Sequence, residues 1–177
     1  FSGGMRQRVM IAMALANNPE LLIADEPTTA LDVTIQDQII RQMRELKEKH
    51  NTGIIFITHD LGVIAELCEK VEVMYGGLIM EEAPIDELFE HPSHPYTLGL
   101  LESMPSIQQD KAERLIPIPG SPPDMTNPPA GCPFAPRCRY ARKICAAELP
   151  ELQPVGEGHS ARCWLLDPEA PSEQNPF

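Results

Sequence analysis

Two short apolar runs constrain the fold of this sequence more than any other feature. Residues 21–24 and 54–57 are continuously apolar, with none of the polar alternation that a half-exposed strand shows. Such runs are typical of strands that are buried on both faces of a parallel sheet. Helical patterns surround both runs, so we predict an α/β fold in which helices flank a parallel sheet.

The segments around these runs predict three helices. Good helix formers fill residues 5–16, directly after two glycines, and Pro19 stops that helix. Apolar residues spaced by four and three predict a second helix over 35–46. Asp60 is positioned to cap a third helix, which runs to about residue 69.

A hairpin and two short helices complete the predicted α/β body. Residues 71–75 and 78–82 read as strands, and the two glycines between them predict a primed hairpin turn. The short helices are expected over 86–90 and 96–104.

The amino-acid composition of the chain changes after Lys111. Eight of the 19 prolines fall between residues 117 and 136, which excludes a continuous helix or a central strand there. We therefore divide the chain into a body over 1–104, an irregular Cys- and Pro-rich extension over 105–166, and a flexible polar tail over 167–177.

The charge of the chain excludes some classes of function. It has 26 acidic and 14 basic residues, and a net charge of −12 has the wrong sign for gathering nucleic-acid phosphates. The longest apolar stretches are too short to cross a bilayer, and no apolar leader is visible. We expect a soluble or peripheral cytosolic protein, in which cysteines favour metal over disulfides.

The first residues have the composition of a phosphate site. Ser2, Gly3 and Gly4 offer a hydroxyl and two backbones that an anion can approach closely, just ahead of a predicted helix. The free N–H groups and the dipole of a helix start favour negative charge. The same residues also make an ordinary loop, so by themselves they leave both interpretations open.

Ionisable residues follow both apolar runs. Asp25 and Glu26 end the first, and His59 follows the second, so all three are expected at the sheet edge where α/β folds bind ligands. One carboxylate can hold Mg²⁺ through water while the other orients an attacking water, and a histidine can hydrogen-bond a γ-phosphate. Acidic strand ends that simply meet solvent, and a capping histidine, are the alternatives.

Four segments together resemble the motifs of ABC-type ATPases, in their family order. They are residues 1–8 (Phe-Ser-Gly-Gly-Met-Arg-Gln-Arg, the ABC signature), 22–27 (Leu-Ile-Ala-Asp-Glu-Pro, Walker B), 28–32 (Thr-Thr-Ala-Leu-Asp, the D-loop) and 57–60 (Ile-Thr-His-Asp, the switch histidine). The resemblance implies the C-terminal part of an ABC nucleotide-binding domain, which uses ATP and Mg²⁺.

The resemblance also implies roles for single residues. Asp25 would serve Mg²⁺, Glu26 would be the catalytic carboxylate, and His59 would sense the γ-phosphate. Asp32 would contact a second ATPase subunit across a dimer. The residues that would contact ATP held by that opposite subunit are Ser2, Gly3, Gly4 and Met5.

Two departures from the ABC pattern shape this interpretation. Met5 stands where the common signature has Gln, and this variant is typical of peptide-importer subunits. No Gly-Lys pair occurs, so the sequence has no P-loop, and the Q-loop is missing too. We interpret the chain, which begins at Phe1, as a fragment that by itself neither binds ATP well nor hydrolyses it.

Four cysteines of the extension form a candidate metal site. Cys132, Cys138, Cys145 and Cys163 can supply a tetrahedral thiolate site that would order a proline-rich segment. The spacing has no Cys-x2-Cys knuckle, which argues against a zinc ribbon and is compatible with an iron–sulfur cluster. Scattered structural cysteines are the alternative.

Residues 94–97, 118–120 and 131–138 resemble the C-terminal extension of dipeptide and oligopeptide importer ATPases. Some members of that family carry a 4Fe–4S cluster on four such cysteines. The resemblance therefore implies this cluster, with a structural role, in preference to Zn²⁺, and His159 is an alternative ligand.

The implied function is ATP hydrolysis that energises import of di- and oligopeptides, by a peripheral subunit at the cytoplasmic face of the membrane. The implied partners are a second ATPase subunit, two membrane permeases and, indirectly, an extracytoplasmic binding protein. Importers of nickel or glutathione share these motifs, so the cargo stays open. A non-transport ABC ATPase would show a long coiled-coil insertion or basic surfaces, which this sequence lacks. A metal-stabilised interaction module is the third alternative, for the fragment alone.

Overall fold

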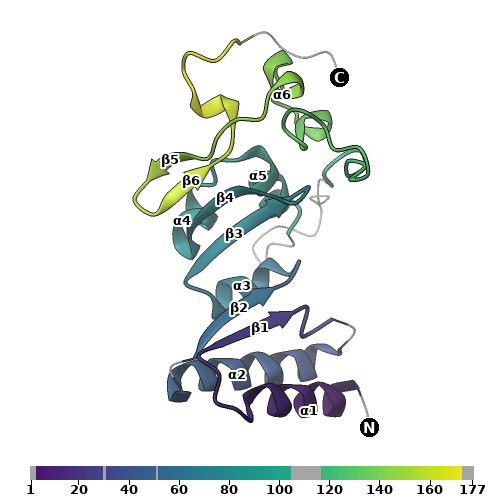
Figure 1. The fold of residues 1–177 in the computed structure, drawn as a ribbon, viewed down its shortest axis with the longest axis vertical. Helices are drawn as coiled ribbons and strands as arrows, with labels where there is room; N and C mark the ends of the chain where they lie inside the picture. The colour runs from purple at the N-terminus through teal and green to yellow at the C-terminus, as the bar shows by residue number, and fades with distance from the viewer. Residues whose placement is uncertain (1–2, 30, 51, 105–116, 173–177) are drawn as a thin grey trace, which may run out of the picture. The chain divides into compact units, whose positions relative to one another are not determined.

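The computed structural model describes residues 3–29, 31–50, 52–104 and 117–172. Figure 1 shows the course of the chain, which divides into two compact units, residues 1–69 and 70–177. The first unit carries the candidate nucleotide residues and the second carries the four cysteines of the extension. The predicted boundary between residues 104 and 105 adjoins a range outside the described residues, so it stays a prediction.

The first unit contains a parallel strand pair flanked by helices. Its elements are α1 (Gly3–Leu15), β1 (Leu21–Asp25), α2 (Val33–His50), β2 (Gly53–Ile57) and α3 (Leu61–Leu67). β1 and β2 are parallel, with Leu21 opposite Gly53 and Asp25 opposite Ile57. The predicted α/β fold with a parallel sheet and flanking helices is confirmed.

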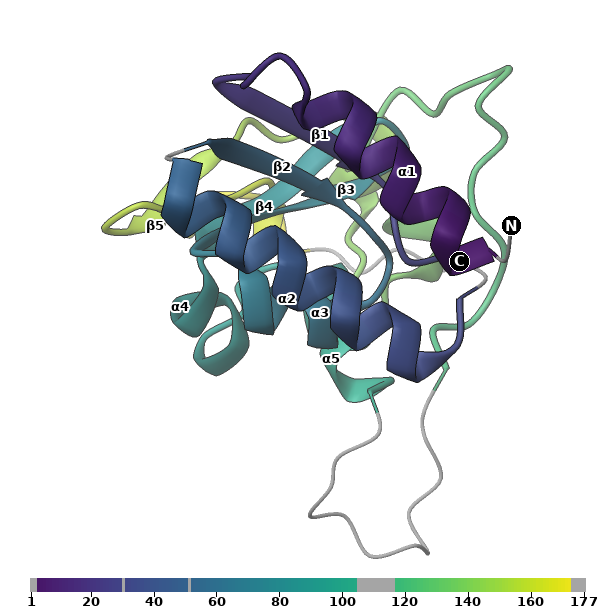
Figure 2. The same ribbon diagram turned by 90° about the horizontal axis from the view of Figure 1, so that it is seen from below.

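The core of this unit lies on one face of the strand pair. α1 and α2 both cover that face (Figure 2), and Leu22 and Ala24 of β1 cluster there with Ile39 of α2. On the other face, Leu21 and Ile23 are 52% and 61% exposed. The expectation that this run is buried on both faces is therefore wrong for the described residues, because both long helices lie on the same side.

The third helix begins where the sequence predicts. The Asp60 carboxylate accepts the backbone N–H groups of Gly62 and Val63, at 2.9 and 3.4 Å. These N–H groups have no partner inside the helix, so the side chain caps it.

The second unit begins with the predicted hairpin and short helices. β3 (Lys70–Tyr75) and β4 (Leu78–Pro84) are antiparallel, and α4 (Ile85–Glu90) and α5 (Pro95–Glu102) follow. Both turn residues, Gly76 and Gly77, have positive φ values of 57° and 75°. A primed turn requires this conformation at both positions, and glycine adopts it without strain.

The extension adds two strands that the sequence analysis did not predict. β5 (Gln153–Gly156) and β6 (His159–Ala161) extend the hairpin into one antiparallel sheet of order β3-β4-β6-β5. The remaining short elements are η1 (Ala135–Arg137), α6 (Lys143–Ala147) and η2 (Trp164–Leu166). Just after β6, the backbone N–H of Arg162 donates to the carbonyl of Met80 at 2.7 Å, which joins the extension to β4.

An aromatic cluster orders the proline-rich part of the extension. The ring centroids of Tyr75 and Tyr96 are 4.6 Å apart, and Phe134 lies 5.4 and 5.2 Å from them. Arg137 donates to the carbonyls of Ile118 and Pro119, at 3.1 and 2.7 Å. Side-chain packing and side-chain hydrogen bonds therefore hold a segment in which proline prevents regular structure.

Candidate functional site

The carboxyl end of the parallel strand pair carries the predicted catalytic residues. Asp25 is the last residue of β1, and the backbone N–H of Glu26 donates to the carbonyl of Ile57 at 2.9 Å. Glu26 has a φ of +45°, in the left-handed region that residues with a side chain rarely adopt. This conformation falls directly after the last residue of β1, where the chain leaves the sheet.

Glu26 and His59 meet at this edge, as the sequence predicts for the ends of neighbouring parallel strands. His59 Nδ1 lies 3.1 Å from Glu26 Oε1, and the Thr29 hydroxyl donates to Glu26 Oε2 at 2.6 Å. Both Glu26 and His59 are exposed, with 45% and 79% of their side-chain surface accessible. Solvent and ligands can therefore reach both groups.

These contacts favour the ionised form of Glu26. The hydrogen bond from Thr29, and next the one from His59, lower the pKa of Glu26 below its ordinary value of 4.5. Glu26 is thus a carboxylate at neutral pH, as a group that orients a nucleophilic water must be. Thr29 was missed by the sequence analysis, although it lies only three residues after Glu26 in the chain.

The glycines at the start of the chain are part of the first helix rather than a loop before it. α1 begins at Gly3, and Gly4 is buried. A Cβ at Gly4 would lie 2.7 Å from Ile35 Cγ2, so the missing side chain lets α1 approach α2 closely. The N–H groups of this first turn have no partner within the helix, as an anion site requires. Ser2 lies outside the described residues.

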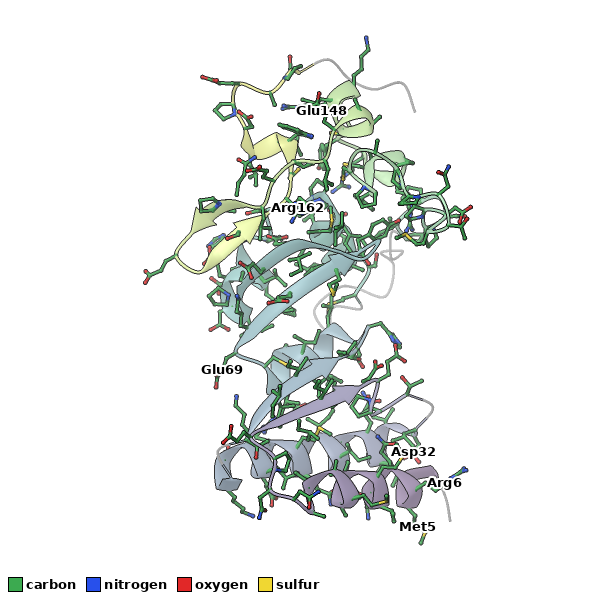
Figure 3. All side chains as sticks on the ribbon, viewed as in Figure 1. Met5, Arg6, Asp32, Glu69, Glu148 and Arg162 are labelled. Carbon is green, nitrogen blue, oxygen red and sulfur yellow. The ribbon has the colours of Figure 1, made fainter. Side chains whose placement is uncertain are left out.

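Met5 and Asp32 lie at the same end of the first unit as Arg6 (Figure 3). Asp32 Oδ1 accepts the backbone N–H of Ile35 at 3.0 Å, so its carboxylate caps the start of α2. The predicted roles of Met5 and Asp32 towards a second subunit concern contacts outside this chain, and they stay predictions.

The four cysteines of the extension come together in the second unit. All four line one cavity of about 20 Å³: Cys132, Cys138, Cys145 and Cys163. The sulfur of Cys145 accepts the backbone N–H of Arg142 at 3.3 Å. Nearby backbone N–H groups act to lower the pKa of the other three thiols, those of Cys132, Cys138 and Cys163, against the larger effect of burial. Backbone N–H groups aimed at sulfur stabilise thiolates and are one of the factors that tune iron–sulfur sites.

Burial favours the protonated form of three of these thiols, those of Cys132, Cys138 and Cys163. It raises the pKa of Cys132, that of Cys138 to about 11 and that of Cys163 to about 12. Among the described residues, no group of three or more His, Cys, Asp or Glu side chains is placed to hold a metal ion as the side chains stand.

A buried polar cluster lies beside the sheet of the second unit. Glu81 is fully buried, and its carboxylate accepts the backbone N–H groups of Ser93 at 2.6 Å and His94 at 3.0 Å. His159 Nε2 lies 2.8 Å from Glu81 Oε1, and His159 Nδ1 lies 3.8 Å from Glu87. His159 therefore pairs with carboxylates, and it does not line the cysteine cavity.

His94 lines the same cavity as the cysteines and is 2% exposed. Its burial lowers its pKa to about 4. Neither His94 nor Glu81 was singled out from the sequence as a site residue. The only hint was the proline on each side of residues 93 and 94, which predicts a loop whose backbone N–H groups need partners.

Two protein families match this sequence. Residues 1–29 match the ABC transporter family, which gives the class of protein. Residues 80–145 match the family described as "Oligopeptide/dipeptide transporter, C-terminal region". No helix in the described part of the chain is long and apolar enough to cross a bilayer.

Full-length relatives agree with both matches. The chain is 57% identical, over 99% of its length, to the oligopeptide transport ATP-binding protein OppD of Bacillus subtilis. It is 56% identical, over 97% of its length, to the dipeptide transport ATP-binding protein DppD of Lactococcus lactis. It spans about half of each relative, 49% in both cases. A solved dimeric bacterial ABC transporter cassette matches 48% of the chain, and the chain covers 36% of it, with 38% identity and a TM-score of 0.44.

The family match thus assigns the start of the chain, residues 1–29, to the ABC transporter family. Residues 80–145 match the C-terminal region of oligopeptide/dipeptide transporters, and along nearly its whole length the chain is similar to ATP-binding proteins of such transporters.

Proposed function

We propose that this chain is the C-terminal part of an ATP-hydrolysing subunit that energises import of di- and oligopeptides. The observation that carries the proposal is the exposed Glu26 carboxylate, held between the Thr29 hydroxyl and His59 at the carboxyl edge of a parallel sheet. An ionised, accessible and oriented carboxylate at such an edge can position a water for attack on a phosphate.

Each residue of this edge has a separate task in the proposal. Asp25, at the end of β1, holds Mg²⁺ through water, and Glu26 orients the attacking water. His59 donates a hydrogen bond to the γ-phosphate once the nucleotide is in place.

The start of α1 serves a nucleotide held by another subunit. Gly3, Gly4 and Met5 lie in the first turn of α1, and Asp32 lies at the same end of the unit as Met5. In the proposal these residues, together with Ser2, face that nucleotide. Two ATPase subunits, identical or homologous, form this composite site in the proposal. Two membrane permeases and, indirectly, an extracytoplasmic binding protein complete the importer at the cytoplasmic face of the membrane.

The cysteine cavity holds a thiolate-ligated group in this proposal, preferably a 4Fe–4S cluster. What supports this is that four thiol side chains line one cavity and that the sulfur of Cys145 accepts the backbone N–H of Arg142. The ligands would be Cys132, Cys138, Cys145 and Cys163. Such a group supplies a cross-link among segments that are distant in sequence. Anaerobically purified protein should show broad visible absorbance, and a colourless protein with stoichiometric zinc would refute the cluster.

The test of the ATPase is the substitution Glu26→Gln in the full-length subunit, assembled with its partners. Glutamine keeps the size and one acceptor oxygen but cannot act as a base, so hydrolysis should fall by about 10²-fold or more while ATP binding persists. Glu45→Gln is the matched control, because Glu45 is an exposed glutamate paired with Lys49 on α2. Unchanged turnover in Glu26→Gln would refute the assigned role.

A further inference from the structure

The side chain of His59 is too exposed for packing to fix it. It is 79% accessible, and its Nδ1 lies 3.1 Å from Glu26 Oε1. An exposed ring makes few van der Waals contacts, so the direction of the imidazole depends on where the turn after β2 places its backbone. The contacts that fix this turn therefore decide whether His59 faces Glu26.

The residue after His59 fixes this turn from several sides. The backbone N–H of Asp60 donates to the Thr58 hydroxyl at 3.1 Å, and Asp60 Oδ1 accepts the N–H of Gly62 at 2.9 Å, at the start of α3. The other oxygen, Asp60 Oδ2, accepts the side-chain amide of Gln36 at 3.2 Å. Because a carboxylate oxygen only accepts, the amide nitrogen of Gln36 faces it.

Gln36 lies in the first turn of α2, which is itself well fixed. The backbone N–H of Gln36 donates to the carbonyl of Asp32 at 2.9 Å, and the Asp32 carboxylate accepts the N–H of Ile35 at 3.0 Å. The amide of Gln36 therefore projects from a capped helix start to the turn that carries His59.

Two further side-chain contacts join α2 to α3 and the residues just after it. Arg44 pairs with Glu66, and Lys47 pairs with Glu69, both at 2.7 Å. Both pairs come later than Gln36 and Asp60 in their segments. They hold the same elements together and make no contact with the turn at His59, so they offer a control for it.

We propose that Gln36 is a positioning residue for His59: its amide holds the Asp60 carboxylate beside α2 and so keeps the imidazole directed at Glu26. This inference rests on the proposed ATP hydrolysis, in which Glu26 orients water and His59 donates to the γ-phosphate. Gln36 acts only through Asp60. Loss of its hydrogen bond should therefore slow hydrolysis more than it weakens ATP binding.

The first test is Gln36→Glu in the full-length subunit, assembled with its partners. The new carboxylate meets the carboxylate of Asp60, so two acceptors of like charge replace a donor and an acceptor. Because misplacing a reacting group by about 1 Å can cost about 10²-fold, we expect kcat for ATP hydrolysis to fall by about tenfold. KM for ATP should change by less than about twofold.

The second test restores the contact with its direction reversed. In the double variant Gln36→Glu, Asp60→Asn, the asparagine amide donates to the glutamate, while its oxygen still accepts the N–H groups that start α3. Asparagine caps helices as well as aspartate does, so α3 keeps its cap. The double variant should recover kcat to within about twofold of the wild type.

The matched control is Lys47→Gln, which breaks the contact with Glu69 and leaves Gln36 in place. It should leave kcat unchanged. Three outcomes would overturn the inference: wild-type kcat in Gln36→Glu, a double variant as slow as the single one, or equal slowing by Lys47→Gln, which would indicate a general loss of contact between α2 and α3.

Failure of the proposed function gives a different result. A wild-type subunit that hydrolyses no ATP, or a Glu26→Gln variant that turns over normally, would refute the function and the role of Gln36 with it. If the wild type is active and Glu26→Gln is not, a silent Gln36→Glu variant overturns the role of Gln36 alone.

Discussion

Gly131 lies directly against the backbone of Cys145 and Ala146, so adding a single methyl group there should lower the stability of the second unit. A Cβ at Gly131 would lie 2.3 Å from the carbonyl oxygen of Cys145 and 2.7 Å from the carbonyl carbon of Ala146. Both atoms belong to the backbone, so no side-chain rotation can relieve the contact. The next residue, Cys132, donates its N–H to the same Cys145 oxygen at 2.7 Å.

The magnitude follows from this geometry. Ordinary contact between the new methyl group and the oxygen needs the two segments to separate by about 1 Å. Overpacking of this kind costs about 1–3 kcal/mol, and loss of the hydrogen bond between Cys132 and Cys145 adds about 1 kcal/mol. We therefore expect Gly131→Ala to lower the free energy of unfolding of the second unit by about 2–4 kcal/mol.

The assay is urea unfolding followed by the fluorescence of Trp164, the single tryptophan of the chain. Trp164 reports on the second unit, where its Nε1 donates to the carbonyl of Glu148 at 2.9 Å. With a slope of about 2 kcal/mol per molar urea, the midpoint should fall by about 1–2 M. Gly156→Ala is the matched control, because its Cβ would meet the nearest atom at 3.8 Å. Equal midpoints for the two variants would refute the reasoning.

Two further predictions concern the carboxylates of each unit. Thr29→Val removes the largest contribution that lowers the pKa of Glu26, so the titration of Glu26, followed by carbon NMR of its carboxyl group, should move up towards 4.5. Because the folded pKa is the lower one, the small stability that Glu26 contributes is present above its unfolded pKa and is lost as the pH falls through the folded pKa; an unchanged titration would contradict the assigned hydrogen bond. Glu81→Ala leaves His159 and two backbone N–H groups without their acceptor, so the Trp164 transition should lose about 3–5 kcal/mol, and a loss below 1 kcal/mol would show that water replaces the carboxylate.

Local sequence signals predicted the parts of the fold that local physics decides. The hairpin over β3 and β4 follows from two adjacent glycines that adopt positive φ, and α3 follows from the capping side chain of Asp60. The meeting of Glu26 and His59 follows from strand order alone, because parallel neighbours end at the same edge. Each of these depends on a few residues close in the chain or on one topological rule.

The remaining features depend on long-range packing that no local pattern encodes. β5 and β6 are short and contain Pro154, so propensity argues against them, and they form because β4 offers an edge for pairing. The exposure of Leu21 was unpredictable because it depends on which face the helices cover. The number of cysteines in the extension indicated that they lie together. The hydrogen bond from the His94 backbone to Glu81 joins residues 13 positions apart, and no sequence pattern predicted it.

The two candidate sites differ in the quantity that a substitution should change. Glu26 and His59 are exposed and form few contacts, so changes there should alter chemistry and leave the unfolding of either unit nearly unchanged. The cysteine cavity is buried within the apolar cluster of Tyr75, Met80 and Phe134, so changes there should alter stability first. Because the apolar clusters of the two units share no residue, Glu26→Gln should leave the Trp164 transition in place, and Gly131→Ala should leave the titration of Glu26 in place. A shift of both quantities by either variant would mean that the surroundings of Glu26 in the first unit and the cysteine cavity in the second are energetically coupled.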